Sequence, residues 1–99
     1  MSTWTFKKGK RESGFLELDR ILNTATRHVE GFRGYMSLLS TEDSNVATIL
    51  TLWRDEETLK KTLSGTIQDA IRVVEDVLES PPKIENFRVF STELFQRSE

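Results

Sequence analysis

The chain has no cysteine, two prolines, one histidine and one tyrosine among its 99 residues. Without cysteine it can form no disulfide bond, no thiolate metal site and no cysteine nucleophile. Excess charge of one sign is also scarce, because 14 basic and 16 acidic residues leave a net charge of −2. This balance argues against binding to nucleic acid or to an anionic membrane. No apolar run approaches the roughly 20 residues of a membrane span. Residues 1–8 lack the apolar stretch of a signal peptide, so we expect a cytoplasmic protein.

Apolar residues make up 36% of the chain and charged residues 30%. This composition is typical of a folded globular protein rather than a disordered one. The length is that of one domain, and the sequence contains no internal repeat, low-complexity tract or linker. We therefore expect residues 1–99 to form a single domain.

Four segments have the pattern of β-strands. Residues 3–8 alternate between apolar and polar side chains, and residues 32–39 resume this period further along the chain. Residues 46–53 form the most β-like run, and the polar residues 41–45 before them predict an antiparallel hairpin. A last strand is predicted over residues 84–94.

Two regions have helical spacing. Apolar residues three and four positions apart predict a helix over residues 15–29, with Gly31 as its stop. The acidic run 55–57 opens a second, short helix, which we expect Ser64-Gly65 to interrupt. The pair Thr66 and Asp69 resembles a capping box that starts another helix. Pro81-Pro82 cannot continue it.

The resulting order is strand, helix, strand, strand, helix pair, strand. This is the βαββαβ pattern of a ferredoxin-like sandwich, an α+β fold in which both helical regions cover one face of a four-stranded antiparallel sheet. The prediction leaves the second face of the sheet without cover.

That second face is predicted to be apolar, although a strand facing water should alternate. Within residues 46–53, one face carries Val46, Thr48, Leu50 and Leu52, and the other carries Ala47, Ile49, Thr51 and Trp53. Met36 and Leu38 add to one side of the preceding strand, and Tyr35 and Leu39 to the other. A soluble monomer rarely tolerates such a patch, so we expect a homodimer that buries it face to face. The alternative is a thinly covered sheet with scattered surface Leu and Val.

Three segments of the chain form a recognisable set: Gly31-Phe32-Arg33-Gly34-Tyr35, Thr48-Ile49-Leu50-Thr51-Leu52-Trp53 and Pro81-Pro82-Lys83-Ile84-Glu85-Asn86-Phe87. Together they resemble the antibiotic biosynthesis monooxygenase family, and the similarity extends from about Trp4 to Leu94. The resemblance implies a dimeric α+β barrel of ferredoxin-like subunits.

The resemblance also bears on activity. Some members of this family oxidise quinol-like aromatics with dioxygen and no cofactor, and their pattern has an Asn four residues before the strand-ending Trp. Here that Trp aligns with Trp53, and the Asn position is Ile49. Haem-degrading members use an Asn on the first strand, a Trp on the second helical segment and a His on the last helix. Residues 3–8 lack Asn and residues 54–80 lack both Trp and His, so we expect no haem degradation by that mechanism and no cofactor.

The candidate site residues are Trp53, Tyr35, Ile49 and His28. Trp53 shares a strand face with Ile49, and its indole can stack on a planar ligand while its N–H donates a hydrogen bond; alternatively it fills the end of the core. Tyr35 can position a phenolic ligand or serve as a core aromatic with a wet hydroxyl. His28 is the side chain best suited to move a proton, and its alternative is an ordinary surface or partly buried histidine.

Other site classes find little support in the sequence. A single histidine without a fixed partner makes neither a metal site nor a catalytic triad, and the acidic run 55–57 is explained by its place at a helix start, so we expect no metal. Arg33 and Arg88 can hold an anionic ligand or lie along the surface with their charge in water.

The first hypothesis is therefore a small cofactor-independent monooxygenase, or a related enzyme, that acts on a planar aromatic or quinol-like molecule. Its pocket would lie between sheet and helices. The alternative is a non-catalytic homodimer that binds a small ligand or serves in a stress response. A third reading, the effector-binding half of a transcription regulator, shares the βαββαβ order, but the chain has no room for a helix-turn-helix.

Overall fold

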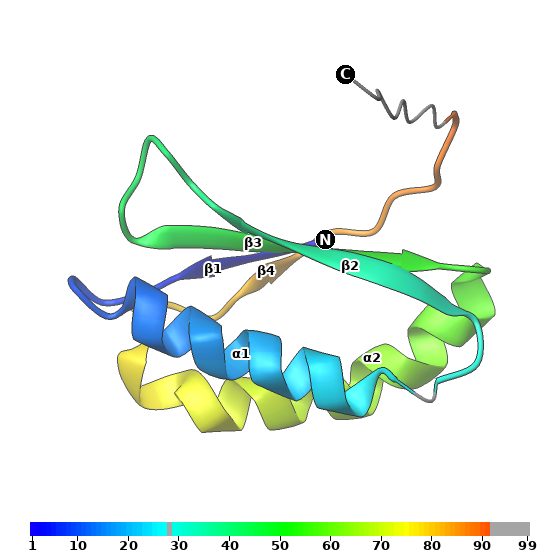
Figure 1. The fold of residues 1–99 in the computed structure, drawn as a ribbon, viewed down its shortest axis with the longest axis horizontal. Helices are drawn as coiled ribbons and strands as arrows, with labels where there is room; N and C mark the ends of the chain where they lie inside the picture. Colours follow the sequence, from blue (N-terminus) through cyan, green and yellow to red (C-terminus); the bar gives the residue numbers. More distant parts are fainter. Residues whose placement is uncertain (28, 92–99) are drawn as a thin grey trace, which may run out of the picture.

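The computed structural model describes residues 1–27 and 29–91. The elements follow one another along the chain as β1 (Ser2–Thr5), α1 (Arg11–Ala25), β2 (Phe32–Leu39), β3 (Val46–Trp53), α2 (Glu56–Val74), the 3-10 turn η1 (Glu75–Val77) and β4 (Lys83–Ile84). The strands form one antiparallel sheet in the order β2-β3-β1-β4. Figure 1 shows α1 and α2 on the same side of this sheet. The predicted ferredoxin-like α+β architecture is therefore confirmed.

The β2–β3 hairpin has the predicted bounds at both strands. Tyr35 lies opposite Thr51 and Met36 opposite Leu50, with an irregularity between Phe32 and Gly34. The guanidinium of Arg11, at the start of α1, binds the turn that joins β2 to β3. It donates to the main-chain carbonyls of Ser40, Asp43 and Val46, at 2.8, 3.1 and 3.3 Å. Helix α1 and the hairpin turn are therefore held together by charge-assisted hydrogen bonds.

The hydrophobic core lies between the helices and the sheet. Along β1 and β3, every second side chain points toward α1 and α2, and these side chains are buried. They pack with residues from both helices and from the segment after α2. The core consists of Trp4, Phe6, Phe15, Leu18, Ala47, Ile49, Ala70, Val74 and Leu78.

The predicted helix over 15–29 was wrong at both ends, because α1 runs from Arg11 to Ala25. The chain leaves the helix at Thr26, whose hydroxyl donates to the carbonyl of Leu22. A side chain that bonds back to its own helix competes with the next turn of backbone hydrogen bonds. Gly31 is not the helix stop; with φ at +88° it forms the approach to β2, and its carbonyl accepts from the N–H of Arg54 at 2.7 Å.

The predicted break at Ser64-Gly65 was also wrong, since α2 is continuous from Glu56 to Val74. A glycine inside a helix costs only about 1 kcal/mol, which packing on either side of it can offset. Thr66 and Asp69 consequently lie within the helix and not at its start. The actual cap is Asp55, whose carboxylate accepts from the N–H of Thr58.

Both outer strands are shorter than expected. The strand predicted over 3–8 is β1, and Phe6 makes only one isolated bridge, to Leu78. The strand predicted over 84–94 is limited to Lys83–Ile84, which pair with Thr3 and Ser2 of β1. Glu85 continues this pairing with one residue more, because its N–H donates to the Met1 carbonyl. Residues 86–91 leave the sheet, and Phe90 in this segment is 97% exposed. Residues 92–94 lie outside the described part of the chain.

The sheet face away from the helices is apolar, as predicted. Met36, Leu38 and Leu52 lie there, 50%, 47% and 41% exposed, and Met36 is paired with Leu50. No described element covers them. Among the described residues, no helix combines the length and hydropathy needed to cross a bilayer.

Two helical glycines provide a test of the α1 packing. A Cβ on Gly14 would lie 2.6 Å from the buried ring of Phe6, whereas one on Gly65 would meet nothing within 4 Å. We expect Gly14→Ala to lower the free energy of unfolding by about 1–3 kcal/mol through overpacking. Gly65→Ala should raise it by up to about 1 kcal/mol, because alanine favours the helix. Urea unfolding of both variants checks this, and equal effects of the two would contradict the packing described here.

Candidate functional site

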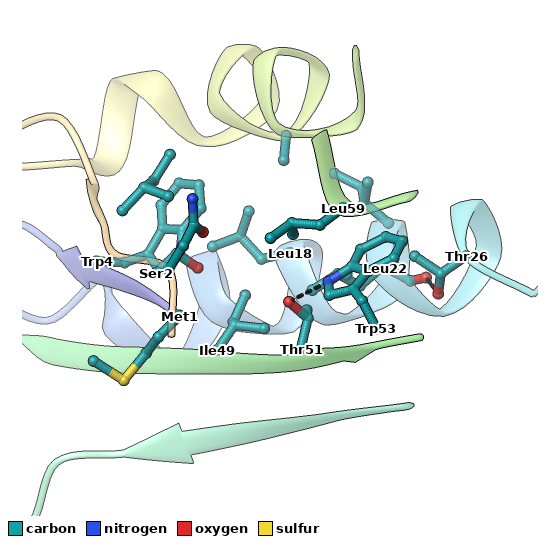
Figure 2. Close-up of a pocket in the computed structure, with 14 residues that line it drawn as sticks. Met1, Ser2, Trp4, Leu18, Leu22, Thr26, Ile49, Thr51, Trp53 and Leu59 are labelled. Carbon is teal, nitrogen blue, oxygen red and sulfur yellow. Dashed lines mark hydrogen bonds between the residues drawn. The ribbon is translucent and has the colours of Figure 1, made fainter. Parts of the chain in front are cut away.

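A cavity of about 50 Å³ lies between the helix-facing side of the sheet and the two helices. Figure 2 shows Ile49, Thr51 and Trp53 pointing from β3 toward Leu18 and Leu22 of α1 and Leu59 of α2. Both tryptophans of the chain, Trp4 and Trp53, line it. The described residues that line the cavity bring no titratable side chain to it. Its chemistry is therefore that of a small apolar and aromatic pocket.

The polar side chains that line this inner cavity are Ser2, Thr26, Thr51 and Asn86. The indole N–H of Trp4 donates to the Ser2 hydroxyl at 2.9 Å. Likewise, the indole N–H of Trp53 donates to the Thr51 hydroxyl at 2.8 Å, the bond drawn in Figure 2. The Trp53 N–H that we expected to bind a ligand is therefore engaged within the protein. What Trp53 offers a planar ligand is the face of its ring.

The Trp53 ring is held in place by β2. Phe32, paired with Trp53 across the hairpin, contacts it edge to face with ring centroids 4.9 Å apart and planes at 69°. Such a contact stabilises one ring orientation. Together with the bond to Thr51, it leaves the indole fixed at the end of β3, where the inner cavity meets a second hollow.

The predicted site residues do not all come together. Trp53 and Ile49 both line the inner cavity. Tyr35 does not; it lies on β2 near the edge of the sheet, where its hydroxyl accepts from the amide of Asn23 at 3.3 Å. His28 lies outside the described residues, although Thr26, two positions before it, lines the cavity.

A wider outer cleft of about 470 Å³ adjoins the inner cavity. It lies between the end of β3, the start of α2 and the segment after β4. Thr51, Trp53, Leu59 and Asn86 line both hollows, so these four side chains form the boundary between them. The outer cleft, unlike the inner cavity, has charged side chains, namely Arg54, Asp55, Glu56 and Arg88.

The charges at the start of α2 are largely neutralised by one another. Arg54 donates to Asp55 at 2.9 Å and lies 3.5 Å from Glu30, and these carboxylates raise the pKa of Arg54. Hydrogen bonds from the backbone and hydroxyl of Thr58, and then from Arg54, lower the pKa of Asp55 to about 2. Asp55 is therefore ionised at neutral pH, and a general acid or base needs a pKa near the working pH. Its role is to cap α2.

Metal binding finds no support among the described residues. They contain no group of three or more His, Cys, Asp or Glu side chains arranged to hold an ion. Of the two arginines considered as anion ligands, Arg33 is exposed on β2 and Arg88 lines the outer cleft.

Comparison with known proteins identifies the family. The family model for antibiotic biosynthesis monooxygenases matches residues 1–72. The chain belongs to this family. No curated protein matches the sequence, so the remaining likenesses are to solved structures.

Two of these structures come from Nitrosomonas europaea and Methanosarcina mazei Go1. The first, the NE2512 protein of unknown function, has a TM-score of 0.76 and 18% identity, over 94% of this chain and 88% of that one. The second, a conserved protein, has a TM-score of 0.73 and 22% identity, over 88% and 86%. A protein of Bacteroides thetaiotaomicron described as a putative antibiotic biosynthesis monooxygenase has a TM-score of 0.73 and 15% identity, over 97% of this chain and 91% of that one. At these identities the likeness shows the fold.

Sequence reasoning missed Trp4, Thr51 and Asn86. The alternation of β1 and β3 contains the signal for the first two, because it places Trp4 and Thr51 on the same sheet face as Ile49 and Trp53. No pattern pointed to Asn86, which had been assigned to the interior of a long last strand.

The Asp55 cap predicts a specific pH dependence. Because the folded pKa of about 2 is below the ordinary aspartate pKa of 3.8, ionised Asp55 stabilises the fold above about pH 4 and loses this effect as the pH falls toward 2. Removing one of its donors, in Thr58→Val, should raise the pKa of Asp55 while the helix still forms. Carboxyl NMR titration of wild type and variant measures both values. A wild-type midpoint near 3.8 would contradict this description of the cap.

Proposed function

We propose that this protein is a cofactor-independent monooxygenase that binds a planar, electron-rich aromatic molecule across the inner cavity and the adjoining outer cleft, with its ring against Trp53. The observation that supports it most is the fixed ring of Trp53, which lines both the apolar inner cavity and the wider outer cleft of about 470 Å³. Membership in the antibiotic biosynthesis monooxygenase family supports the same chemistry.

The reaction is oxidation of a phenol or quinol anion by dioxygen. One oxygen atom forms a new carbonyl on the ring, the other leaves as water, and the substrate supplies all the electrons, so that a phenol and dioxygen give a quinone and water. The protein's part is to hold the ring against Trp53 and Ile49 and to keep water away from the anion. His28 is our candidate to accept the phenolic proton.

The second candidate is a non-catalytic homodimer that binds a small ligand or serves in a stress response. It is favoured by Ile49, which places a hydrocarbon where the quinol-oxidising pattern has an amide. It is also favoured by the described lining, which offers no titratable side chain. The two candidates share the inner cavity and differ in whether the bound molecule is turned over.

We further propose that the working form is a homodimer in which two sheets face each other. The exposed side chains Met36, Leu38 and Leu52 occupy the sheet face opposite the helices. A second copy related by a two-fold axis can bury the same patch on both subunits at once. We place the chain in the cytoplasm, and a soluble protein there is protected from nonspecific association when such an apolar patch is covered.

Ligand binding is tested with 1-naphthol. It should raise the melting temperature of the wild type, and Trp53→Ala should weaken its binding at least about tenfold by removing the stacking surface. Val73→Ala, a change at an exposed residue of α2, serves as the matched control and should bind normally. Dioxygen uptake with the same compound separates the candidates. Uptake supports the enzyme, binding without uptake supports the second candidate, and no binding at all would rule out the cavity as a ligand site.

The dimer is tested by placing a charge on the open face. Leu50→Lys should convert the dimer to a monomer at micromolar concentration, because it would bury an unpaired ammonium group. Leu16→Lys, at an exposed position of α1, is the control and should leave the dimer intact. Sedimentation velocity measures both, and a Leu50→Lys variant that sediments as a dimer would show that another surface mediates association.

A further inference from the structure

The outer cleft is open to water in a single chain. Three of its apolar lining residues, Leu52, Phe87 and Val89, are 41%, 68% and 60% exposed. A small-molecule site buries most of its ligand, and the reaction proposed above requires that water be kept away from an anion. One chain therefore provides the ring of Trp53 and one side of such a site, but no described residue covers it.

The segment after β4 is apolar and extends away from its own subunit. Residues 86–91, which we call the arm, carry Phe87, Val89 and Phe90. Figure 1 shows the arm, in orange, rising from the sheet on the side opposite the helices. Phe90 is 97% exposed and lines neither hollow. A side chain of this size is strongly stabilised by burial, yet the described part of its own subunit offers Phe90 no surface to pack on.

The same chain has an apolar surface that the arm can cover. The open face, formed by Met36, Leu38 and Leu52, is the side of the sheet toward which the arm rises. Leu52 also lines the outer cleft, so a group that covers this end of the open face covers the cleft as well. In a two-fold dimer the arm of each subunit can lie on the open face of the other, which buries both surfaces at once. This self-complementarity favours a second copy over an unrelated partner.

We infer that the outer cleft is a shared site, closed by the arm of the partner subunit, which contributes Phe90 to it. The inference rests on the proposed function, from which it takes the aromatic ligand against Trp53 and the face-to-face dimer. It goes beyond the proposed function because it makes the ligand site incomplete in one chain. Ligand affinity should therefore fall when the arm is altered, even though Phe90 lines no part of the site in its own subunit.

The first experiment replaces Phe90 with serine. Phe90→Ser should raise the dimer dissociation constant at least about tenfold, because each dimer loses two buried phenylalanine side chains. At a concentration where the wild type is dimeric and the variant monomeric, the variant should bind 1-naphthol at least about tenfold more weakly. Val73→Ser removes an exposed apolar side chain from α2; it is the matched control and should change neither constant. Sedimentation velocity and calorimetry measure the two constants.

The second experiment tests whether Phe90 acts on the other subunit. Trp53→Ala lacks the stacking surface and Phe90→Ser lacks the arm residue, so neither variant alone should bind 1-naphthol tightly. A mixed dimer has one complete site, in which Trp53 comes from one chain and Phe90 from the other. Mixing the two variants, at a concentration where both are dimeric, should therefore restore wild-type affinity at a fraction of the sites. A Phe90 that acts within its own chain would give no restoration.

Each failure has a distinct meaning. If Phe90→Ser dimerises as tightly as the wild type, or if its monomer binds 1-naphthol with wild-type affinity, the arm does not complete the cleft and the inference is wrong, while the proposed function stands. Mixed variants that still bind weakly would contradict a shared site. A wild type that sediments as a monomer would contradict the proposed dimer and this inference with it. If the wild type binds no 1-naphthol, the proposed ligand site fails and the inference fails as well.

Discussion

A sheet of four strands has two faces, and the described residues provide two long helices to cover them. Both helices pack on one face, so β1 and β3 present their two sides to different environments. On the helix side Ala47 is fully buried and Trp4 nearly so. On the other side, apolar residues of β2 and β3 remain half exposed. Because the helices cover one face of the sheet, the core and the cavity form on that face, and the opposite face is the surface that we propose a second copy covers.

The inner cavity lies beneath that cover, between β1, β3 and β4 on one side and α1 and α2 on the other. Large aromatic side chains line it without filling it, and their N–H groups are satisfied by hydroxyls on their own strands, two residues away. This arrangement leaves an interior in which few groups can still bond to a ligand. Trp53 and Asn86 line both this interior and the charged outer cleft.

The sequence predicted the structure best where the pattern of apolar side chains along a strand agrees with their burial. Residues 46–53 are apolar on both faces, and this property predicted the bounds of β3 and the open apolar face. It was least informative where tertiary context overrides local preference. Gly65 reads as a helix breaker but lies inside α2, because one unfavourable residue is outweighed by packing along a helix of 19 residues.

The candidate site could be predicted in part for the same reasons. Trp53 and Ile49 were identified because they share a face of one strand. Asn86 was not identified, because its environment depends on where β4 ends. The end of β4 is set by its pairing with the short strand β1, which is distant in the sequence. Tyr35 lies on the helix side of β2, but β2 is an edge strand and Tyr35 does not line the cavity. The Tyr35 hydroxyl accepts a hydrogen bond from Asn23 of α1 instead.

The central claim, that an aromatic molecule enters between the sheet and the helices, can be tested directly because both tryptophans of the chain line that space. Their two indole N–H resonances can be followed by ¹H–¹⁵N NMR during addition of 1-naphthol. The structure predicts that both resonances shift together and saturate at one ligand per chain. Resonances that stay in place while the ligand binds would put the ligand elsewhere on the molecule and contradict this account.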